Sequence, residues 1–166
     1  MSNAQVGIIM GSQSDLNIME EAAKFLKSFG ITYEIRIISA HRAPDLLAEW
    51  GGTARERGMK VIIAGAGGAA HLPGVTAAFT TLPVIGVPVR SRISIDGWDS
   101  ILSILQMPSG VPVATVALDA AKNAGILAAQ IIGTHDEGIA KKLADFKVEM
   151  RDKVIASGLE LKEKGY

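Results

Sequence analysis

The stretch VIIAGAGGAAHLPG, residues 61–74, decides the fold. It opens with four apolar residues, passes through a loop rich in glycine and alanine, and ends at a Leu-Pro-Gly sequence. A short run that is apolar at every position is typical of a strand buried on both faces of a sheet. Proline favours the first turn of a helix. The stretch therefore predicts a buried strand, a glycine-rich loop and a helix in direct succession.

The same succession recurs along the chain. Besides Val61–Ala64, the predicted strands are Val6–Met10, Tyr33–Ile38, Val84–Val87 and Val113–Val116. The predicted helices are one that ends at Gly30, one from Pro44 to Gly58 with a weak point at Gly51-Gly52, one after His71-Leu72-Pro73-Gly74, one over Ser100–Met107 and one over Ala120–Ile132. Alternating strands and helices predict a parallel sheet covered on both faces. Right-handed crossovers make a flavodoxin-like, doubly wound sheet in a three-layer α/β/α sandwich the simplest topology.

The C-terminal part of the chain has a different composition. Residues 135–166 carry 14 of the 34 charged residues, and Thr134-His135-Asp136-Glu137 has the form of a capping box. Apolar residues then recur at helical spacing: Ile139, Leu143, Phe146, Met150 and Val154. The pairs Glu137–Lys141 and Glu149–Lys153 would support a long helix. We expect residues 1–133 to form the flavodoxin-like domain and residues 134–166 to form its helical arm. The apolar stripe either closes its own domain or, as we favour, packs on a neighbouring subunit.

Composition excludes several classes of protein. The 166 residues contain 17 basic and 17 acidic side chains, so the chain lacks the positive field that binding to a nucleic-acid backbone needs. There are no cysteines, which excludes disulfides and thiolate metal sites. No signal peptide is visible, and no apolar run approaches the ~18 residues of a membrane span. The sequence predicts a cytoplasmic domain that binds neither nucleic acid nor membrane.

Three unusual segments directly follow predicted strands. They are Gly11-Ser12-Gln13-Ser14-Asp15, Ser39-Ala40-His41-Arg42-Ala43-Pro44-Asp45 and the glycine loop that begins at Gly65. Ligands of open parallel sheets bind outside the carboxyl ends of the strands. If the three strands are neighbours, the three segments converge on one cleft.

The residue types in these segments suit an anionic, hydroxyl-bearing ligand. A glycine turn with Ser12, Ser14 and Asp15 at a helix start favours phosphate or polyol, the alternative being ordinary helix capping by Ser14 or Asp15. The forked donors of Arg42 suit phosphate, and His41 can take and give a proton near neutral pH.

The glycine loop admits a ligand close to the backbone, because glycine has no side chain. Gly65-x-Gly67-x-x-Ala70 also fits a variant of the dinucleotide-binding fingerprint, a weak match because Pro73 follows and no acidic residue lies near position 90. No P-loop ending and no G-x-S-x-G is present, and three histidines without carboxylates at ligand spacing predict no metal site. His135 lies at the expected start of the C-terminal helix, and this position accounts for it without a role in the site.

Taken in order and spacing, these motifs resemble the N5-carboxyaminoimidazole ribonucleotide mutases, the PurE family of purine biosynthesis. The resemblance covers about residues 5–140 and extends through PVIGVPV at 83–89 and DSILSILQMP at 99–108. It implies a flavodoxin-like fold, a homo-octamer, a phosphoribosyl-aminoimidazole substrate, and catalysis without metal or cofactor. The carboxylate of the substrate would migrate from nitrogen to carbon C4.

The resemblance also implies roles for individual residues. Ser12, Ser14 and Asp15 would contact the phosphoribosyl part, Ser39 and Arg42 the phosphate, and His41 would be the proton shuttle. His71 would hold the migrating carboxylate, together with the loop residues Gly67, Gly68, Ala69 and Leu72. Residues 90–98 and 119–125 depart from the family pattern. Two alternatives stay open: a carboxylase that uses free carbon dioxide, which the sequence AAHLPG disfavours, and a non-catalytic nucleotide-binding module, which the His41-Arg42 pair disfavours.

Overall fold

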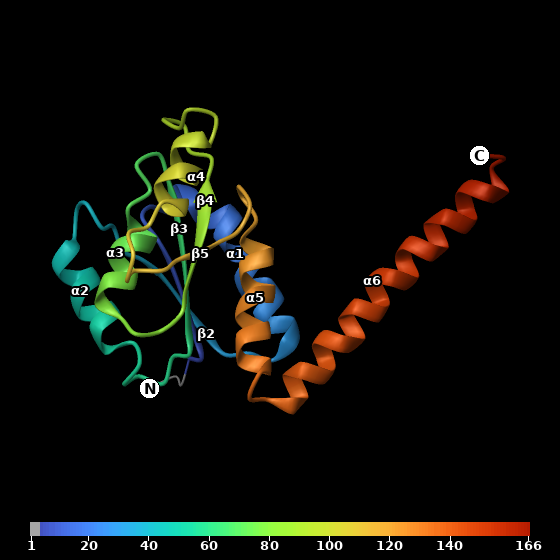
Figure 1. Ribbon diagram of the computed structural model, residues 1–166, viewed down its shortest axis with the longest axis horizontal. Coiled ribbons are helices and arrows are strands. Elements are labelled where there is room, and N and C mark those ends of the chain that lie inside the picture. The colour runs from blue at the N-terminus through green and yellow to red at the C-terminus, as the bar shows by residue number, and fades with distance from the viewer. Residues whose placement is uncertain (1–3) are drawn as a thin grey trace. The chain divides into compact units, whose positions relative to one another are not determined.

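Five parallel strands in the order β2-β1-β3-β4-β5 form the sheet of the first of two structural units, which ends at Ala129. The computed structural model describes residues 4–166 (Figure 1). The strands are β1 (Val6–Met10), β2 (Tyr33–Ile37), β3 (Val61–Gly67), β4 (Val84–Val89) and β5 (Ala114–Thr115). This strand order is that of the flavodoxin-like doubly wound sheet, so the predicted fold class is confirmed.

The predicted strand ends differ from the observed ones where pairing with a neighbouring strand determines the length of the strand. β3 runs three residues beyond Ala64, because Gly65 and Gly67 pair in register with Val87 and Val89 of β4. Strand β5 is reduced to two residues at the sheet edge. β2 is the other edge strand, and Ile37 is 52% exposed. The expectation that every strand is buried on both faces is therefore wrong for the two edges.

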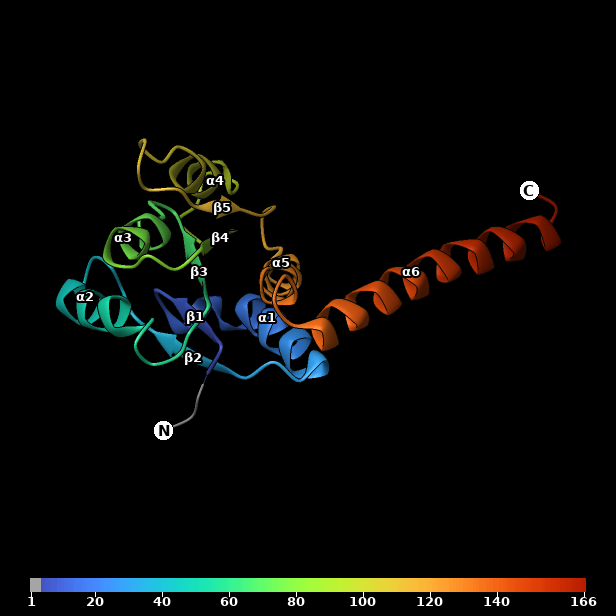
Figure 2. The same ribbon diagram turned by 60° about the horizontal axis from the view of Figure 1, so that its bottom comes forward.

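Helices cover both faces of this sheet (Figure 2). Their bounds are α1 (Leu16–Phe29), α2 (Pro44–Thr53), α3 (Leu72–Phe79), α4 (Trp98–Leu105) and α5 (Ala121–Gly133), and a 3-10 turn, η1 (Gln13–Asp15), precedes α1. α1 ends at Gly30 as predicted, with φ of 74°. α2 ends at Thr53 instead of Gly58, because the glycine pair falls in its last turn and Gly58 itself has φ of 90°. α3 begins at Leu72, with Pro73 inside its first turn.

Two small residues allow α1 and α2 to approach the sheet. A Cβ on Gly65 of β3 would collide with the side chain of Met19 from α1. A Cβ on Gly7 of β1 would lie 2.7 Å from the Trp50 ring of α2. The core on the α2 face combines Ile9, Leu47, Trp50, Ile62, Leu72 and Ile104. Close packing on both sides of β1 and β3 fixes the carboxyl edge of the sheet, where the site lies.

The second unit, from Gln130, contains the long helix α6 (Glu137–Glu163). Its N-cap is Asp136, whose carboxylate accepts a hydrogen bond from the Ile139 amide. The predicted capping box is wrong: the Thr134 hydroxyl donates to the carbonyl of Ile131 instead. The long helix itself is confirmed, but Lys141 forms its ion pair with Asp145 and not with Glu137.

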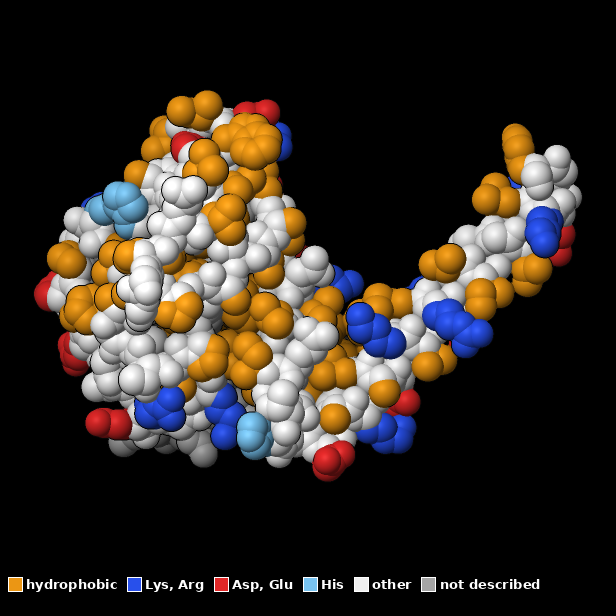
Figure 3. Space-filling view, viewed as in Figure 1, with side chains coloured by type: hydrophobic (Ala, Val, Ile, Leu, Met, Phe, Trp, Pro, Cys, Tyr) orange, Lys and Arg blue, Asp and Glu red, His pale blue; other side chains and the backbone are white. Residues whose placement is uncertain are grey.

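α6 carries two apolar rows on opposite sides. At 100° per residue, the predicted stripe continues from Val154 to Leu161, and Val148, Ile155 and Leu159 form a second row. Every residue from Lys147 onward is exposed, and Val154 is 72% exposed (Figure 3). Among the described residues, no helix is both long and apolar enough to cross a membrane.

Candidate functional site

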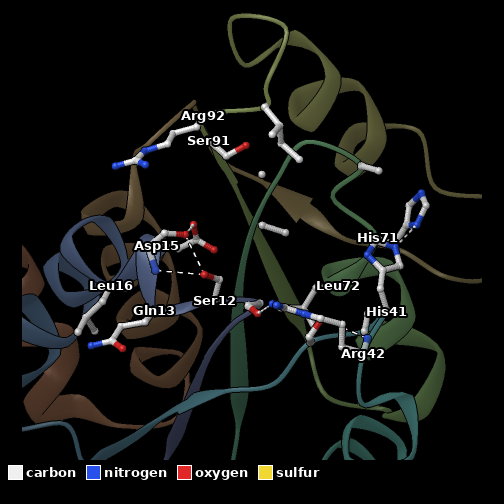
Figure 4. A pocket seen from close by; sticks show the side chains of 18 of the residues that line it. Ser12, Gln13, Asp15, Leu16, His41, Arg42, His71, Leu72, Ser91 and Arg92 are labelled. Atoms are coloured by element: carbon white, nitrogen blue, oxygen red, sulfur yellow. Dashed lines mark hydrogen bonds between the residues drawn. The ribbon is translucent and has the colours of Figure 1, made fainter.

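A cavity of about 1120 Å³ opens at the carboxyl ends of β1, β2, β3 and β4 (Figure 4). Residues that follow each of these four strands line it. The predicted convergence of the first three loops is confirmed. Sequence reasoning missed the fourth loop, Arg90 to Ile93, which belongs to a stretch that departs from the family pattern. It could have been found by the same rule, since it directly follows a strand.

Almost all of the predicted site residues line this cavity. They are Ser12, Ser14, Asp15, Ser39, His41, Arg42, Gly67, Ala69, His71 and Leu72. Gly68 does not line it. It has φ of 63°, and a Cβ there would lie 3.3 Å from the Ile93 side chain. Gly68 therefore shapes the loop without facing the cavity.

Hydrogen bonds between side chains organise the loop after β1. Ser12 caps the turn η1, because its hydroxyl accepts the Ser14 amide at 3.2 Å, and it lies 2.9 Å from the Ser14 hydroxyl. The Ser14 hydroxyl in turn contacts Asp15 Oδ1 at 3.0 Å. The alternative role of this segment, helix capping by the side chain of Ser14 or Asp15, is wrong, since neither side chain caps a helix. Asp15 is thereby held as an acceptor at the cavity wall.

Asp15 is a buried carboxyl group with a perturbed acidity. It is 6% exposed. Burial raises its pKa above the ordinary 3.8, and the hydrogen bond from Ser14 offsets part of that rise. Ionised Asp15 lacks full solvation, so a ligand that donates hydroxyl hydrogens to it would be favoured.

Arg42 joins the first loop to the second. Its Nη2 donates to the Gly11 carbonyl at 2.8 Å, and its Nε donates to Ser39 Oγ at 3.3 Å. The Ser39 hydroxyl also accepts the Arg42 amide at 3.3 Å. The guanidinium is thus fixed at the cavity wall by two of its three nitrogens, and its charge suits a phosphate there.

His41 and His71 form a direct pair, although 30 residues separate them in the sequence. His41 Nε2 lies 2.8 Å from His71 Nδ1, and the rings meet edge to face at 79°. Only one of the two nitrogens can carry the proton of this hydrogen bond, so the ring that donates it fixes the tautomer of the ring that accepts it. Such a pair can pass a proton without a large movement of either side chain.

The glycine loop is packed by its neighbours as well as open to the cavity. A Cβ on Gly67 would lie 2.7 Å from Ser91 Cβ and 2.8 Å from the Val89 carbonyl. The space beside Gly65 is filled by Met19. The small residues of the fingerprint-like sequence therefore serve close packing of α1 and of the segment after β4.

The fold and the site define an α/β protein that carries a histidine pair and an anchored arginine at the carboxyl edge of a parallel sheet. Comparison with known proteins is in line with this. The profile of the family described as AIR carboxylase matches residues 5–153, and the chain belongs to this family.

Individual relatives cover nearly the whole chain. The N5-carboxyaminoimidazole ribonucleotide mutase of Thermotoga maritima is 57% identical and spans 98% of this chain and 94% of its own length. The enzyme of the same name from Vibrio vulnificus is 59% identical over 92% of this chain and 96% of its own length. The crystal structure of Treponema denticola PurE has a TM-score of 0.84 at 33% identity, and covers 95% of this chain and 98% of its own.

Replacing Asp15 with Asn should stabilise the fold at neutral pH. A raised folded-state pKa means that the native state binds the proton more tightly than the unfolded chain does. The free energy of unfolding of the wild type therefore falls as pH rises above 3.8, and the cost of burying the ionised carboxylate persists at neutral pH. The uncharged amide of Asn does not carry this cost. Urea unfolding of both proteins from about pH 4 to about pH 8 should show a gap that widens with pH. A gap that stays constant would contradict the assignment.

Proposed function

We propose that the chain is a mutase that interconverts N5-carboxyaminoimidazole ribonucleotide and 4-carboxy-5-aminoimidazole ribonucleotide in the de novo synthesis of the purine nucleotide IMP. The observation that carries the proposal is the His41–His71 pair beside an anchored arginine and a buried aspartate in one cavity. Relatives that are 56–59% identical and bear the mutase name support it.

The reaction needs one proton to be moved twice. In the first nucleotide the carboxylate sits on the exocyclic nitrogen as a carbamate. When that nitrogen gains a proton, the C–N bond breaks, its electron pair stays on nitrogen, and carbon dioxide is released. Ring carbon C4 is nucleophilic, as in an enamine, and attacks the retained carbon dioxide. C4 then loses its proton, which balances the proton given to nitrogen, so one imidazole serves both steps.

The residues divide between these tasks. His41 delivers and recovers the proton, and its bond to His71 sets the tautomer that can do so. His71, Leu72 and the backbone of Gly67 and Ala69 hold the carboxylate and keep water away from the freed carbon dioxide, and Gly68 only shapes the loop. Ser12, Ser14 and Asp15 bind the ribose, and Ser39 and Arg42 bind the phosphate.

A carboxylase that takes free carbon dioxide is the second candidate. The phosphoribosylaminoimidazole carboxylase of Vigna aconitifolia is 49% identical over 97% of this chain, which spans 29% of that longer protein. An assay with the N-carboxylated nucleotide, run beside one with aminoimidazole ribonucleotide and bicarbonate, separates the two reactions. A binding module without activity would turn over neither.

We further propose that the chain acts as a homo-oligomer, an octamer by resemblance, in the cytoplasm, where its phosphorylated substrate is retained. The apolar rows of α6 support assembly. Most helical stability comes from packing an apolar face, and neither row of α6 is covered beyond Phe146.

His41→Asn should lower kcat by at least ~10²-fold, the usual worth of a general acid–base group, while nucleotide binding is kept. The matched control is His135→Asn, since His135 contacts Thr134 and does not line the cavity. Steady-state kinetics and equilibrium binding of the product nucleotide measure the two effects. A His41→Asn enzyme as fast as the His135→Asn enzyme would exclude the shuttle role.

Arg42→Ala should weaken binding of the nucleotide by roughly 1.5–3 kcal/mol, the worth of a charge-assisted hydrogen bond. Binding of the corresponding nucleoside, which has no phosphate, should change much less. Arg55→Ala is the control, because Arg55 bonds to Thr81 outside the cavity. If nucleotide and nucleoside lose equal affinity, Arg42 does not bind the phosphate.

Truncation after Gly133 should leave a folded α/β core that sediments as a smaller species with reduced activity. Each large apolar side chain of α6 that is buried in an assembly contributes roughly 1.5–3 kcal/mol. Sedimentation velocity and circular dichroism report size and fold separately. An unchanged sedimentation coefficient with full activity would show that α6 is not an assembly element.

A further inference from the structure

Arg92 is a cation at the cavity wall that the proposed reaction does not use. The acidic and arginine side chains that line the cavity are Asp15, Glu20, Arg42, Arg90 and Arg92. Glu20 is paired with Lys24 at 2.8 Å, and Arg90 is paired with Asp96 at 3.2 Å. The three others have no ion-pair partner within residues 4–166. Of these three, Asp15 is assigned to the ribose and Arg42 to the phosphate, which leaves the charge of Arg92.

The guanidinium of Arg92 is open to a ligand. The side chain is exposed, and it makes no hydrogen bond or ion pair with any part of the chain that the structure describes. Asp15 does not neutralise it: burial raises the pKa of Asp15, whereas a guanidinium in contact with this carboxyl would lower that pKa. Arg92 is therefore an uncompensated positive charge at the wall of the cavity.

A turn fixes the backbone of Arg92 at the rim of the cavity. The Ser94 amide donates to the Ser91 carbonyl at 3.1 Å, so Arg92 and Ile93 occupy the two central positions of a turn. The Ser94 hydroxyl donates to Asp99 at 2.6 Å, which ties this turn to the start of α4. The backbone of Arg92 is thus held, while its long side chain, which has no polar contact of its own, is able to turn toward a ligand.

The Arg92 side chain runs toward the side of the cavity where Asp15 lies, and it lies across the cavity from Arg42 (Figure 4). Asp15 is the residue proposed to bind the ribose. In a ribonucleotide the phosphate is joined to the ribose ring through a single carbon, so the two groups bind next to each other. A phosphate beside a ribose at Asp15 lies in the part of the cavity between the two arginines.

Arg42 by itself does not compensate the charge of a phosphate. A phosphate monoester carries a charge of about −1.5 to −2 near pH 7, and Arg42 supplies one positive charge. Two of the three nitrogens of Arg42 are already bonded, to the Gly11 carbonyl and to Ser39. A second guanidinium supplies both the missing charge and donors that the protein has not used.

We propose that Arg92 also binds the phosphate of the substrate, which is then held between a fixed guanidinium, Arg42, and a mobile one, Arg92. The proposal rests on the function proposed above. Because Arg92 is ordered only when the ligand binds, part of its contribution is lost as side-chain entropy. Its effect on affinity is therefore smaller than that of Arg42, and it depends on the phosphate alone.

The decisive variant is Arg92→Ala, titrated calorimetrically with three ligands. Affinity for 4-carboxy-5-aminoimidazole ribonucleotide and for aminoimidazole ribonucleotide, which both carry phosphate, should fall roughly 5- to 20-fold. Affinity for the nucleoside of the first ligand, which keeps the carboxylate and lacks the phosphate, should stay within about twofold of the wild type. Arg92→Lys keeps the charge but not the fork of donors, so it should lose less affinity for the nucleotides than Arg92→Ala.

The matched control is Arg36→Ala, which removes the same charge from β2 outside the cavity. Arg36 is also exposed, and it lies 3.9 Å from Glu34. Its loss should change the affinity for all three ligands by less than about twofold, since exposed ion pairs contribute little and distant charges are screened.

Three results would overturn the phosphate role of Arg92. They are an equal loss for nucleotides and nucleoside, a loss confined to the two carboxylated ligands, and no loss for any ligand. Wild-type protein that binds both nucleotides tightly but interconverts no carboxylated nucleotide would instead overturn the proposed function and leave the phosphate role of Arg92 intact. The two failures are therefore distinct.

Discussion

The absence of side chains at two positions of β3 is the constraint on which the rest of the structure depends. At Gly65 the strand backbone lies directly against Met19, which brings α1 onto the sheet. At Gly67 it lies against Ser91 and the Val89 carbonyl, which brings in the segment after β4. A larger residue at Gly67 would force the segment after β4 away from the sheet, and one at Gly65 would displace the Met19 side chain that packs there. Since the loops at this edge emerge from those same elements, the cavity depends on the two glycines as well.

Much of the fold follows from hydrophobic pattern, because burial in a parallel sheet demands unbroken apolar runs. β1 and the end of α1 lie where the pattern places them. The predicted strand and helix ends are wrong where contacts between residues far apart in the sequence determine them. β3 continues through its glycines because β4 supplies the pairing partners, and β2 is exposed because it is an edge. The N-cap of α6 is Asp136 and not Thr134, two residues before it, and sequence alone could not choose between these two capping residues.

The candidate site, like the fold, could be predicted from the sequence only in part. Position after a strand was enough to find three of its loops, since parallel strands all end at one edge. It did not pair His41 with His71, because that contact depends on how two loops fold toward each other. Nor did it show that the Ser91 hydroxyl, between Arg90 and Arg92 in the sequence, is buried without a hydrogen-bond partner. The type and position of a residue predict a candidate functional group, but only the folded structure shows whether that group has a hydrogen-bond partner.

The bond from Arg42 to the Gly11 carbonyl couples two halves of the cavity that the sequence separates by 31 positions. The same bond holds both the guanidinium and the turn that carries Ser12 and Asp15 before any ligand arrives. The entropy of fixing that turn is therefore lost on folding and not on binding. A phosphate at Arg42 and a ribose at Asp15, as proposed, would each meet a prepared surface. Offered as separate fragments, the two would bind independently of each other.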